Sequence, residues 1–278
     1  MFTNQMRQST LSFVLLLSLT ACGGGGGGGS STVGSGYVPP PGPTIANTSA
    51  PQYLPMSAGN LWTFSNNSSI RDLGSVSLKC GSCAIQGTKV EQIALYSATP
   101  ALIAIFYMEK GVYPTGPYAG HTMTYFTGIS QDGGATVTVG DYSLDGKITG
   151  DVVMDDTPAA GEVTTFAPGT GSTLSPAVST ITSVGGTEPF ANNTVINSIA
   201  ADTLASGSTI LGWGFARGVG FTSLSTNSST LAMSAFSINV ATAYSAARKP
   251  MTIEPTSVRQ GTSAEIQSAF ASAIDRMR

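Results

Sequence analysis

The chain has 278 residues, of which 41% are hydrophobic and only 10% are charged. It holds 12 Lys and Arg against 15 Asp and Glu, so its net charge at pH 7 is -3. Neutralising the phosphates of a nucleic acid takes clustered basic residues, so we expect no nucleic-acid partner. The composition also argues against disorder, because disordered chains combine low hydrophobicity with high net charge.

The first 22 residues predict an export signal. Arg7 is their only charged residue, and it precedes an apolar stretch, Leu11–Leu19, that is too short to span a bilayer. The motif Leu19-Thr20-Ala21-Cys22 resembles the lipobox of bacterial lipoproteins. The resemblance implies that residues 1–21 are a signal peptide and that Cys22 carries a diacylglycerol anchor with fatty acyl chains such as palmitate. The alternative is an ordinary cleaved signal peptide and a soluble periplasmic protein.

The residues after Cys22 indicate the destination and a tether. Lipoproteins that stay in the inner membrane usually have Asp after the Cys, whereas this chain has Gly23. The resemblance therefore implies a cell-envelope protein anchored in the outer membrane, at its periplasmic face or at the cell surface. Residues 22–49 begin with the unbroken glycine run Gly23–Gly29 and continue in Ser, Gly and Pro, a composition typical of a tether without a packed core.

Residues 50–245 predict an antiparallel β domain. Short apolar or alternating runs are separated by Gly, Asn, Asp or Pro, and turn pairs such as Asp132-Gly133 tolerate positive φ. The apolar run from Ala101 to Met108 predicts a central strand buried on both faces. The expected strands are Trp62–Ser65, Ser75–Lys79, Val90–Ser97, Ala101–Glu109, Thr122–Thr127, Ala135–Val139, Lys147–Met154, Glu162–Phe166, Ser179–Val184, Thr194–Ala200, Ile210–Phe215, Gly220–Leu224 and Thr230–Val240.

Residues 262–278 predict the one long helix, after a linker over residues 246–261. Thr262 and Glu265 have the spacing of a capping box. The apolar residues at helical spacing are Ile266, Phe270, Ile274 and Met277. We expect this face to pack on the sheet, with a partner-binding helix as the alternative; whether residues 250–260 pack on the sheet stays open. The expected fold class is mainly β, a single curved antiparallel sheet like a half-barrel with a C-terminal helix.

Two segments resemble a family of uncharacterised bacterial secreted proteins and lipoproteins. The segment Leu54–Phe64 is similar to its opening PL-x-x-GN-x-W-x-Y motif, and Gly212–Phe221 is similar to its closing W-x-A-x-GVG motif. The resemblance implies a strongly curved antiparallel sheet, similar to the half-barrels of periplasmic lipoprotein carriers, with a helix or loop across its concave side. The resemblance identifies no catalytic residues in this chain.

The aromatic and glycine residues of these motifs have a structural interpretation. Trp62 and Trp213 are large side chains that we expect to fill the core. Gly218 and Gly220 permit a bend or a close backbone approach beside them. A ligand-stacking role for either Trp is the alternative.

The cysteines predict a local disulfide. Cys80 and Cys83 are separated by Gly81-Ser82, which fits a two-residue turn, and thiols of an exported protein oxidise. A thioredoxin-like site would need a helix after the motif, and the sequence predicts none there. A zinc site is not expected, because His121 is the only His in the chain.

The segment from Asp141 to Asp151 resembles a calcium loop. Asp141, Asp145 and Asp151 offer carboxylate ligands at suitable spacing, but Val152 stands where such a loop needs a bidentate acid. A hairpin with an Asp-Gly turn is the favoured interpretation, and weak calcium binding is the alternative. We expect no cofactor.

The sequence offers no catalytic constellation, so we expect no enzyme. His121 is predicted to be a surface or packing residue, and Asp155-Asp156 a solvated turn before Pro158. The expected function is a non-catalytic binding or carrier module for an apolar or lipid ligand. The alternative is a structural or envelope-interaction lipoprotein that binds a protein or glycan.

Overall fold

The computed structural model describes residues 52–80, 86–113, 116–140, 151–166, 177–181, 184–189, 195–200, 204–206, 209–226, 229–238 and 251–278. The chain divides into two units, Met1–Pro39 and Pro40–Arg278, and every described residue belongs to the second. Within these ranges no helix has both the length and the apolar character that a membrane span requires.

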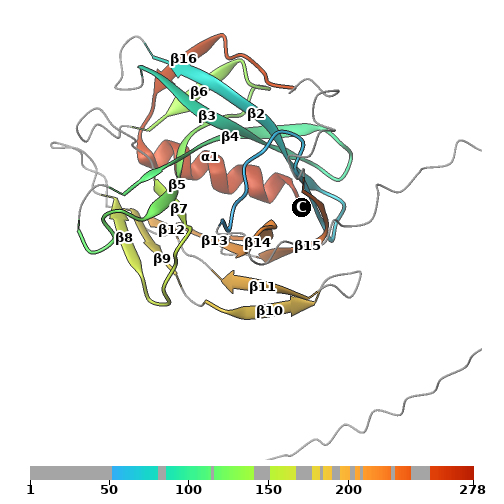
Figure 1. Ribbon diagram of the computed structural model, residues 1–278. Coiled ribbons are helices and arrows are strands. Elements are labelled where there is room, and N and C mark those ends of the chain that lie inside the picture. The colour runs from blue at the N-terminus through green and yellow to red at the C-terminus, as the bar shows by residue number, and fades with distance from the viewer. Residues whose placement is uncertain are drawn as a thin grey trace, which may run out of the picture. The chain divides into compact units, whose positions relative to one another are not determined.

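The described part of the second unit is mainly β, which confirms the expected fold class (Figure 1). Most strands pair with their neighbours along the chain, because short loops with turn residues connect them. The strands are β1 Leu61–Phe64, β2 Ser69–Lys79, β3 Gln86–Tyr96, β4 Leu102–Val112, β5 Thr122–Ser130, β6 Thr136–Val139, β7 Asp151–Asp155, β8 Val163–Phe166, β9 Ala177–Thr180, β10 Gly186–Pro189, β11 Val195–Ala200, β12 Leu204–Ser206, β13 Thr209–Ala216, β14 Gly220–Thr226, β15 Ser229–Ser237 and β16 Ser257–Gln260.

The strands form one large curved sheet that does not close. Its order is β16-β6-β5-β4-β3-β2-β1-β15-β14-β13-β12-β9-β8, with β7 also paired to β5 and β11 to β13. In the described part of the chain no hydrogen-bonded ladder joins β7 to β8 or β9, although these strands are in contact. We call this gap, between β7 on one side and β8 and β9 on the other, the seam.

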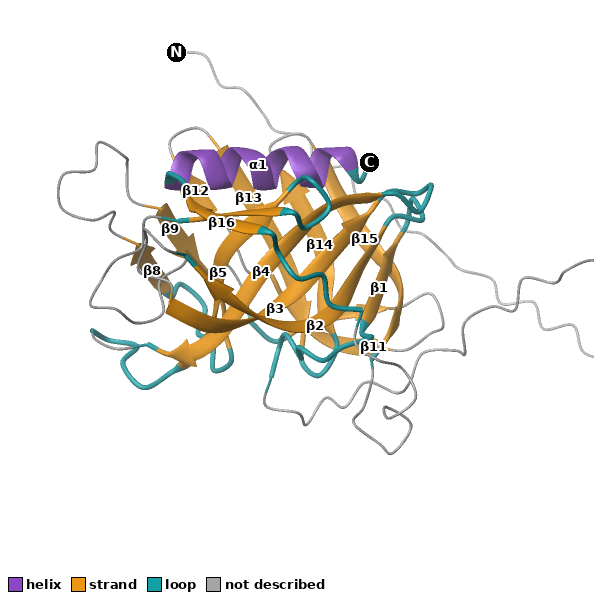
Figure 2. Ribbon diagram, turned by 90° about the horizontal axis from the view of Figure 1, so that it is seen from above, coloured by secondary structure: helices purple, strands orange, loops and turns teal. Residues whose placement is uncertain are grey.

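The helix α1, Ser263–Arg276, covers the inner face of the sheet. Its N-cap is the predicted one, because the Thr262 hydroxyl accepts a hydrogen bond from the Glu265 N–H at 3.1 Å. The predicted apolar face is buried and contacts β4, β5, β13 and β14. Figure 1 shows α1 between the two halves of the curved sheet, and Figure 2 shows it along one end of the strands. The helix therefore packs on strands from both sides of the seam.

Aromatic side chains fill the core beside Gly220. Trp62 is fully buried, and its indole N–H donates to the Val219 carbonyl at 2.7 Å. The Phe221 ring meets this indole edge-on at 5.3 Å. Gly220 has a φ of 102°, and a Cβ placed there would lie 2.7 Å from the Trp62 ring. Only glycine fits both this left-handed conformation and this contact.

The outer face carries a second apolar cluster, which the segment before α1 covers. Ile253 packs on this cluster and exchanges two hydrogen bonds with the Gln92 amide, at 2.7 and 2.8 Å. The strand β16 then pairs with β6 in the one parallel ladder of the described residues. The segment before α1 therefore packs on the sheet through Ile253 and β16. The strands β10, β12 and β16 were not predicted, since each is short and has at most one large apolar residue, which gives no alternating pattern.

Candidate functional site

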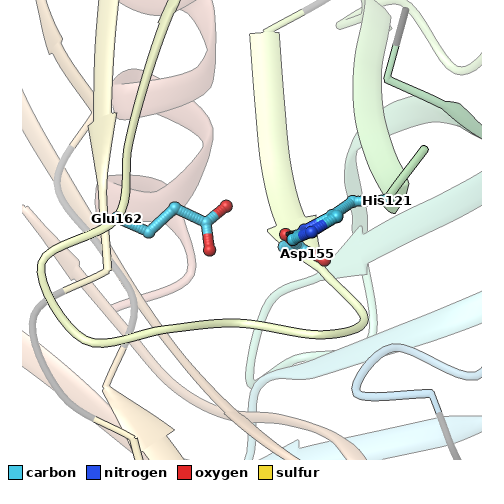
Figure 3. Close-up of side chains that lie close together, drawn as sticks. All are labelled: His121, Asp155 and Glu162. Carbon is cyan, nitrogen blue, oxygen red and sulfur yellow. Dashed lines mark hydrogen bonds and ion pairs between the residues drawn. The ribbon is translucent and has the colours of Figure 1, made fainter. Parts of the chain in front are cut away.

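Three side chains that could bind a metal ion meet at the seam: His121, Asp155 and Glu162. Their ligand atoms all lie within 4.8 Å of one another. Figure 3 shows Glu162 on one side and His121 with Asp155 on the other, with the Glu162 carboxyl pointing toward them. The His121 Nδ1 lies 2.5 Å from Asp155 Oδ2. We call these three residues the seam cluster.

Backbone pairing holds the first two members of the seam cluster. His121 directly precedes β5, and Asp155 is the last residue of β7, opposite Met123 of β5. The other Asp155 oxygen, Oδ1, accepts hydrogen bonds from the Thr157 N–H at 2.7 Å and the Thr157 hydroxyl at 3.1 Å. The antiparallel pairing of β5 with β7 therefore brings together two residues that are 34 positions apart.

Glu162 reaches the cluster from the opposite side of the seam. It directly precedes β8, and its carbonyl accepts from the Ile181 N–H at 2.9 Å, which extends the β8–β9 ladder. Gly161, with a φ of 80°, forms the turn before it. The Glu162 Oε2 atom accepts a hydrogen bond from the Ala159 N–H at 3.1 Å. The cluster thus combines two residues from the β5–β7 side with one from the β8–β9 side.

Two carboxyl groups of the seam cluster are buried close together. Asp155 is 1% exposed and Glu162 is 5% exposed. Burial, and then a hydrogen bond to the Asp155 carboxyl group, raise the pKa of Glu162 to about 7. The hydrogen bond to Asp155 raises the pKa of His121. Two adjacent buried carboxylates cannot both ionise without positive charge between them, so the cluster favours a shared proton or a cation.

A second polar group lies beside the cluster, around Asp156. The Lys110 ammonium pairs with Asp156 Oδ2 at 2.9 Å, and Asp156 Oδ1 accepts from the Tyr53 N–H at 3.1 Å. The Arg217 guanidinium lies 4.7 Å from the centre of the Tyr53 ring and donates to its hydroxyl. Asp156 is therefore compensated by Lys110, whereas the two carboxyl groups of the seam cluster have His121 as the one basic group among the three residues.

The inner face beneath α1 is apolar. The Phe270 ring of α1 stacks on Phe106 at 4.3 Å and lies 4.7 Å from Trp213 and 5.2 Å from Phe126. At this point α1 fills the interior of the curved sheet. Both Trp62 and Trp213 are buried within this core, and Gly218 and Gly220 have left-handed φ values of 71° and 102°.

The sequence-based interpretation of Asp155-Asp156 as a solvated turn was wrong, since both side chains are buried. The pairing of β7 with β5 draws this pair against His121 and Lys110, and no local pattern encodes that pairing. His121 is a partly exposed residue with an ion-pair partner, not an isolated one. One signal in the sequence was missed. The only His of the chain, His121, precedes a strand that was expected in the same sheet as the strand before Asp155.

Several predicted site residues lie outside the described part of the chain. Cys22, Cys83, Asp141 and Asp145 are among them. Cys80 is disulfide-bonded. Asp151 is the first residue of β7, in an antiparallel ladder with β5.

No protein-family model matches the chain, and neither a curated protein nor a solved structure matches it.

Proposed function

We propose that this chain is a membrane-anchored bacterial lipoprotein of the outer membrane whose β domain is a non-catalytic binding module. Its ligand is apolar, such as an acyl chain, and binds on the inner face of the sheet. The motif Leu19-Thr20-Ala21-Cys22 supports the anchor. The ligand is supported by one observation, a curved and unclosed sheet with an aromatic inner face that packs against α1.

An acyl chain can take the place of α1 side chains at low cost. The helix contacts the sheet mainly through apolar residues, and these contacts have no directional requirement. Loop side chains also hydrogen-bond to the backbone of the helix segment, as with the Asn66 amide, which donates to the Met277 carbonyl at 2.6 Å. Displacing Phe270 would therefore leave no buried polar group of that side chain unsatisfied.

The test is native mass spectrometry and lipid extraction on the full chain purified in mild detergent. We expect a stoichiometric bound lipid. After delipidation, a fluorescent fatty acid should bind and increase amide exchange in α1. A lipid-free mass together with no binding of the fluorescent fatty acid would contradict the carrier function.

The second candidate is the structural or envelope-interaction lipoprotein that binds a protein or glycan. The packing of Phe270 against Phe106 and Trp213 favours it, because a filled interior leaves no room for a ligand unless α1 moves. This function predicts the lipid-free mass and unchanged exchange in α1. Cross-linking in intact cells would then identify the partner.

The anchor has its own test. We expect the wild-type chain to incorporate labelled palmitate and to sediment with outer membranes. The Cys22→Ala variant should lose both properties. A labelled Cys22→Ala variant would contradict the lipobox assignment.

A further inference from the structure

The seam cluster contains the donor set of a divalent metal site. His121 supplies an imidazole nitrogen, and Asp155 and Glu162 supply carboxylate oxygens. Imidazole is a good ligand for zinc and other first-row transition metals, whereas calcium takes six to eight oxygen ligands. Three protein ligands of mixed nitrogen and oxygen type, with a fourth position left for water, suit Zn²⁺.

The distances require a small adjustment on binding. In a tetrahedral zinc site, bonds of about 2.0–2.2 Å place neighbouring ligand atoms roughly 3.3 Å apart. The ligand atoms of the seam cluster already lie within 4.8 Å of one another. Binding would also separate His121 Nδ1 from Asp155 Oδ2, which now lie 2.5 Å apart. Rotation about the side-chain bonds of His121 and Glu162 would supply both changes, while Asp155 Oδ1 keeps its hydrogen bonds from Thr157. The backbone therefore need not move far to seat the ion.

Charge points to the same conclusion. The neighbouring cation Lys110 is engaged by Asp156 at 2.9 Å, so it does not neutralise the two acids of the cluster. A dication would balance both carboxylates at once and would replace the close carboxyl–carboxyl contact with two metal bonds. Asp155 is only 1% exposed, so bulk water does not solvate its charge.

We propose that His121, Asp155 and Glu162 bind one Zn²⁺-class transition dication that links the two edges of the sheet across the seam. The ion would join the β5–β7 edge, through His121 and Asp155, to the β8–β9 edge, through Glu162. In the described residues these edges share no hydrogen-bonded ladder, so the metal bonds would add a cross-seam link besides the chain segment 156–162. This inference does not depend on the apolar ligand.

The experiment is calorimetric titration of the chelator-treated full chain, in detergent, with zinc chloride. We expect one Zn²⁺ per chain, and a melting temperature raised by about 5 °C or more at a hundredfold excess over the dissociation constant. His121→Ala and Glu162→Gln should each weaken binding at least about tenfold. Glu91→Gln, which alters a partly buried glutamate of β3 outside the cluster, is the matched control and should bind like wild type.

Amide exchange tests the position of the ion. Zinc should slow exchange in residues 156–162, which cross the seam, and His121→Ala should abolish this effect. His121 is suited to this test because its side chain is 33% exposed, so its removal should leave the fold intact, as circular dichroism would verify. The proposal is overturned if wild type takes up no zinc, if either cluster variant binds as tightly as wild type, or if protection appears away from the seam.

Discussion

The interior beneath α1 and the seam cluster are both buried, yet different interactions hold their side chains. In the interior, aromatic rings such as Phe270 and Phe106 pack without polar groups to satisfy. At the seam, Asp155 and Glu162 face each other with one partly exposed His121 between solvent and the acids. The interior therefore stabilises the domain through burial, whereas the seam holds a polar arrangement that still favours a cation. We therefore expect the interior to determine the stability of the domain and the seam cluster to bind a cation.

The largest expected effect tests the interior. Phe270→Ala should lower the free energy of unfolding by about 4 kcal/mol, because it removes a fully buried ring and leaves a cavity under α1. Chemical denaturation measures the loss. Ser268→Ala, on the exposed side of the same helix, is the control and should change stability little. A loss below about 1 kcal/mol for Phe270→Ala would mean that α1 does not stabilise the sheet.

Gly220→Ala tests the close approach at the edge of the interior. We expect a loss of about 3 kcal/mol, since a φ of 102° strains Ala and its Cβ would meet the Trp62 ring at 2.7 Å. Gly133→Ala is a matched control, because its φ is also left-handed, 76°, but no atom lies within 4 Å of the added Cβ. The control should lose only about 1 kcal/mol. Equal losses would show that backbone strain alone matters at Gly220.

The two regions also differ in how far the sequence predicts them. The apolar face of α1 and its Thr262 cap could be predicted, because their pattern lies within consecutive residues and has a helical period. The central strand β4 was expected to be buried on both faces, and Ile103 to Met108 are buried. Such elements are encoded locally.

The seam cluster is not encoded locally. His121 and Asp155 meet because β7 pairs with one half of the β5 edge while β6 pairs with the other half. Glu162 joins them because a short loop leads from β7 to β8, and the contacts of β7 with β8 and β9 keep the two sides of the seam together. Sequence patterns specify which faces are buried, but the closure of a sheet depends on the sum of many registers and twists.

A buried acid of β2, Asp72, tests how far burial makes a carboxylate unfavourable. Burial, and then the nearby Glu91, raise the pKa of Asp72 to about 7. A pKa raised by folding means that the folded state holds the proton more tightly. Its contribution to stability is present below the unfolded pKa and is lost as pH rises through the folded pKa.

The wild-type chain should therefore lose about 2 kcal/mol from this group between roughly pH 5 and pH 7. Denaturation curves across this range for wild type and Asp72→Asn measure the difference. The variant should show the shallower pH dependence. Glu91→Gln should also make it shallower, because it removes the second cause of the shift. Identical slopes in wild type and Asp72→Asn would contradict the raised pKa.

The smallest effect is expected at the seam itself. Without metal, His121→Ala should lower the free energy of unfolding by no more than about 1 kcal/mol, because an ion pair with one partly exposed partner contributes little. Asp155 would keep its two hydrogen bonds from Thr157, so the buried carboxylate would not be left without donors. Denaturation in the presence of a chelator measures this loss. A loss as large as that of Phe270→Ala would contradict the difference between the two regions. It would mean that the polar cluster, even with no ion bound, stabilises the domain as strongly as the aromatic interior does.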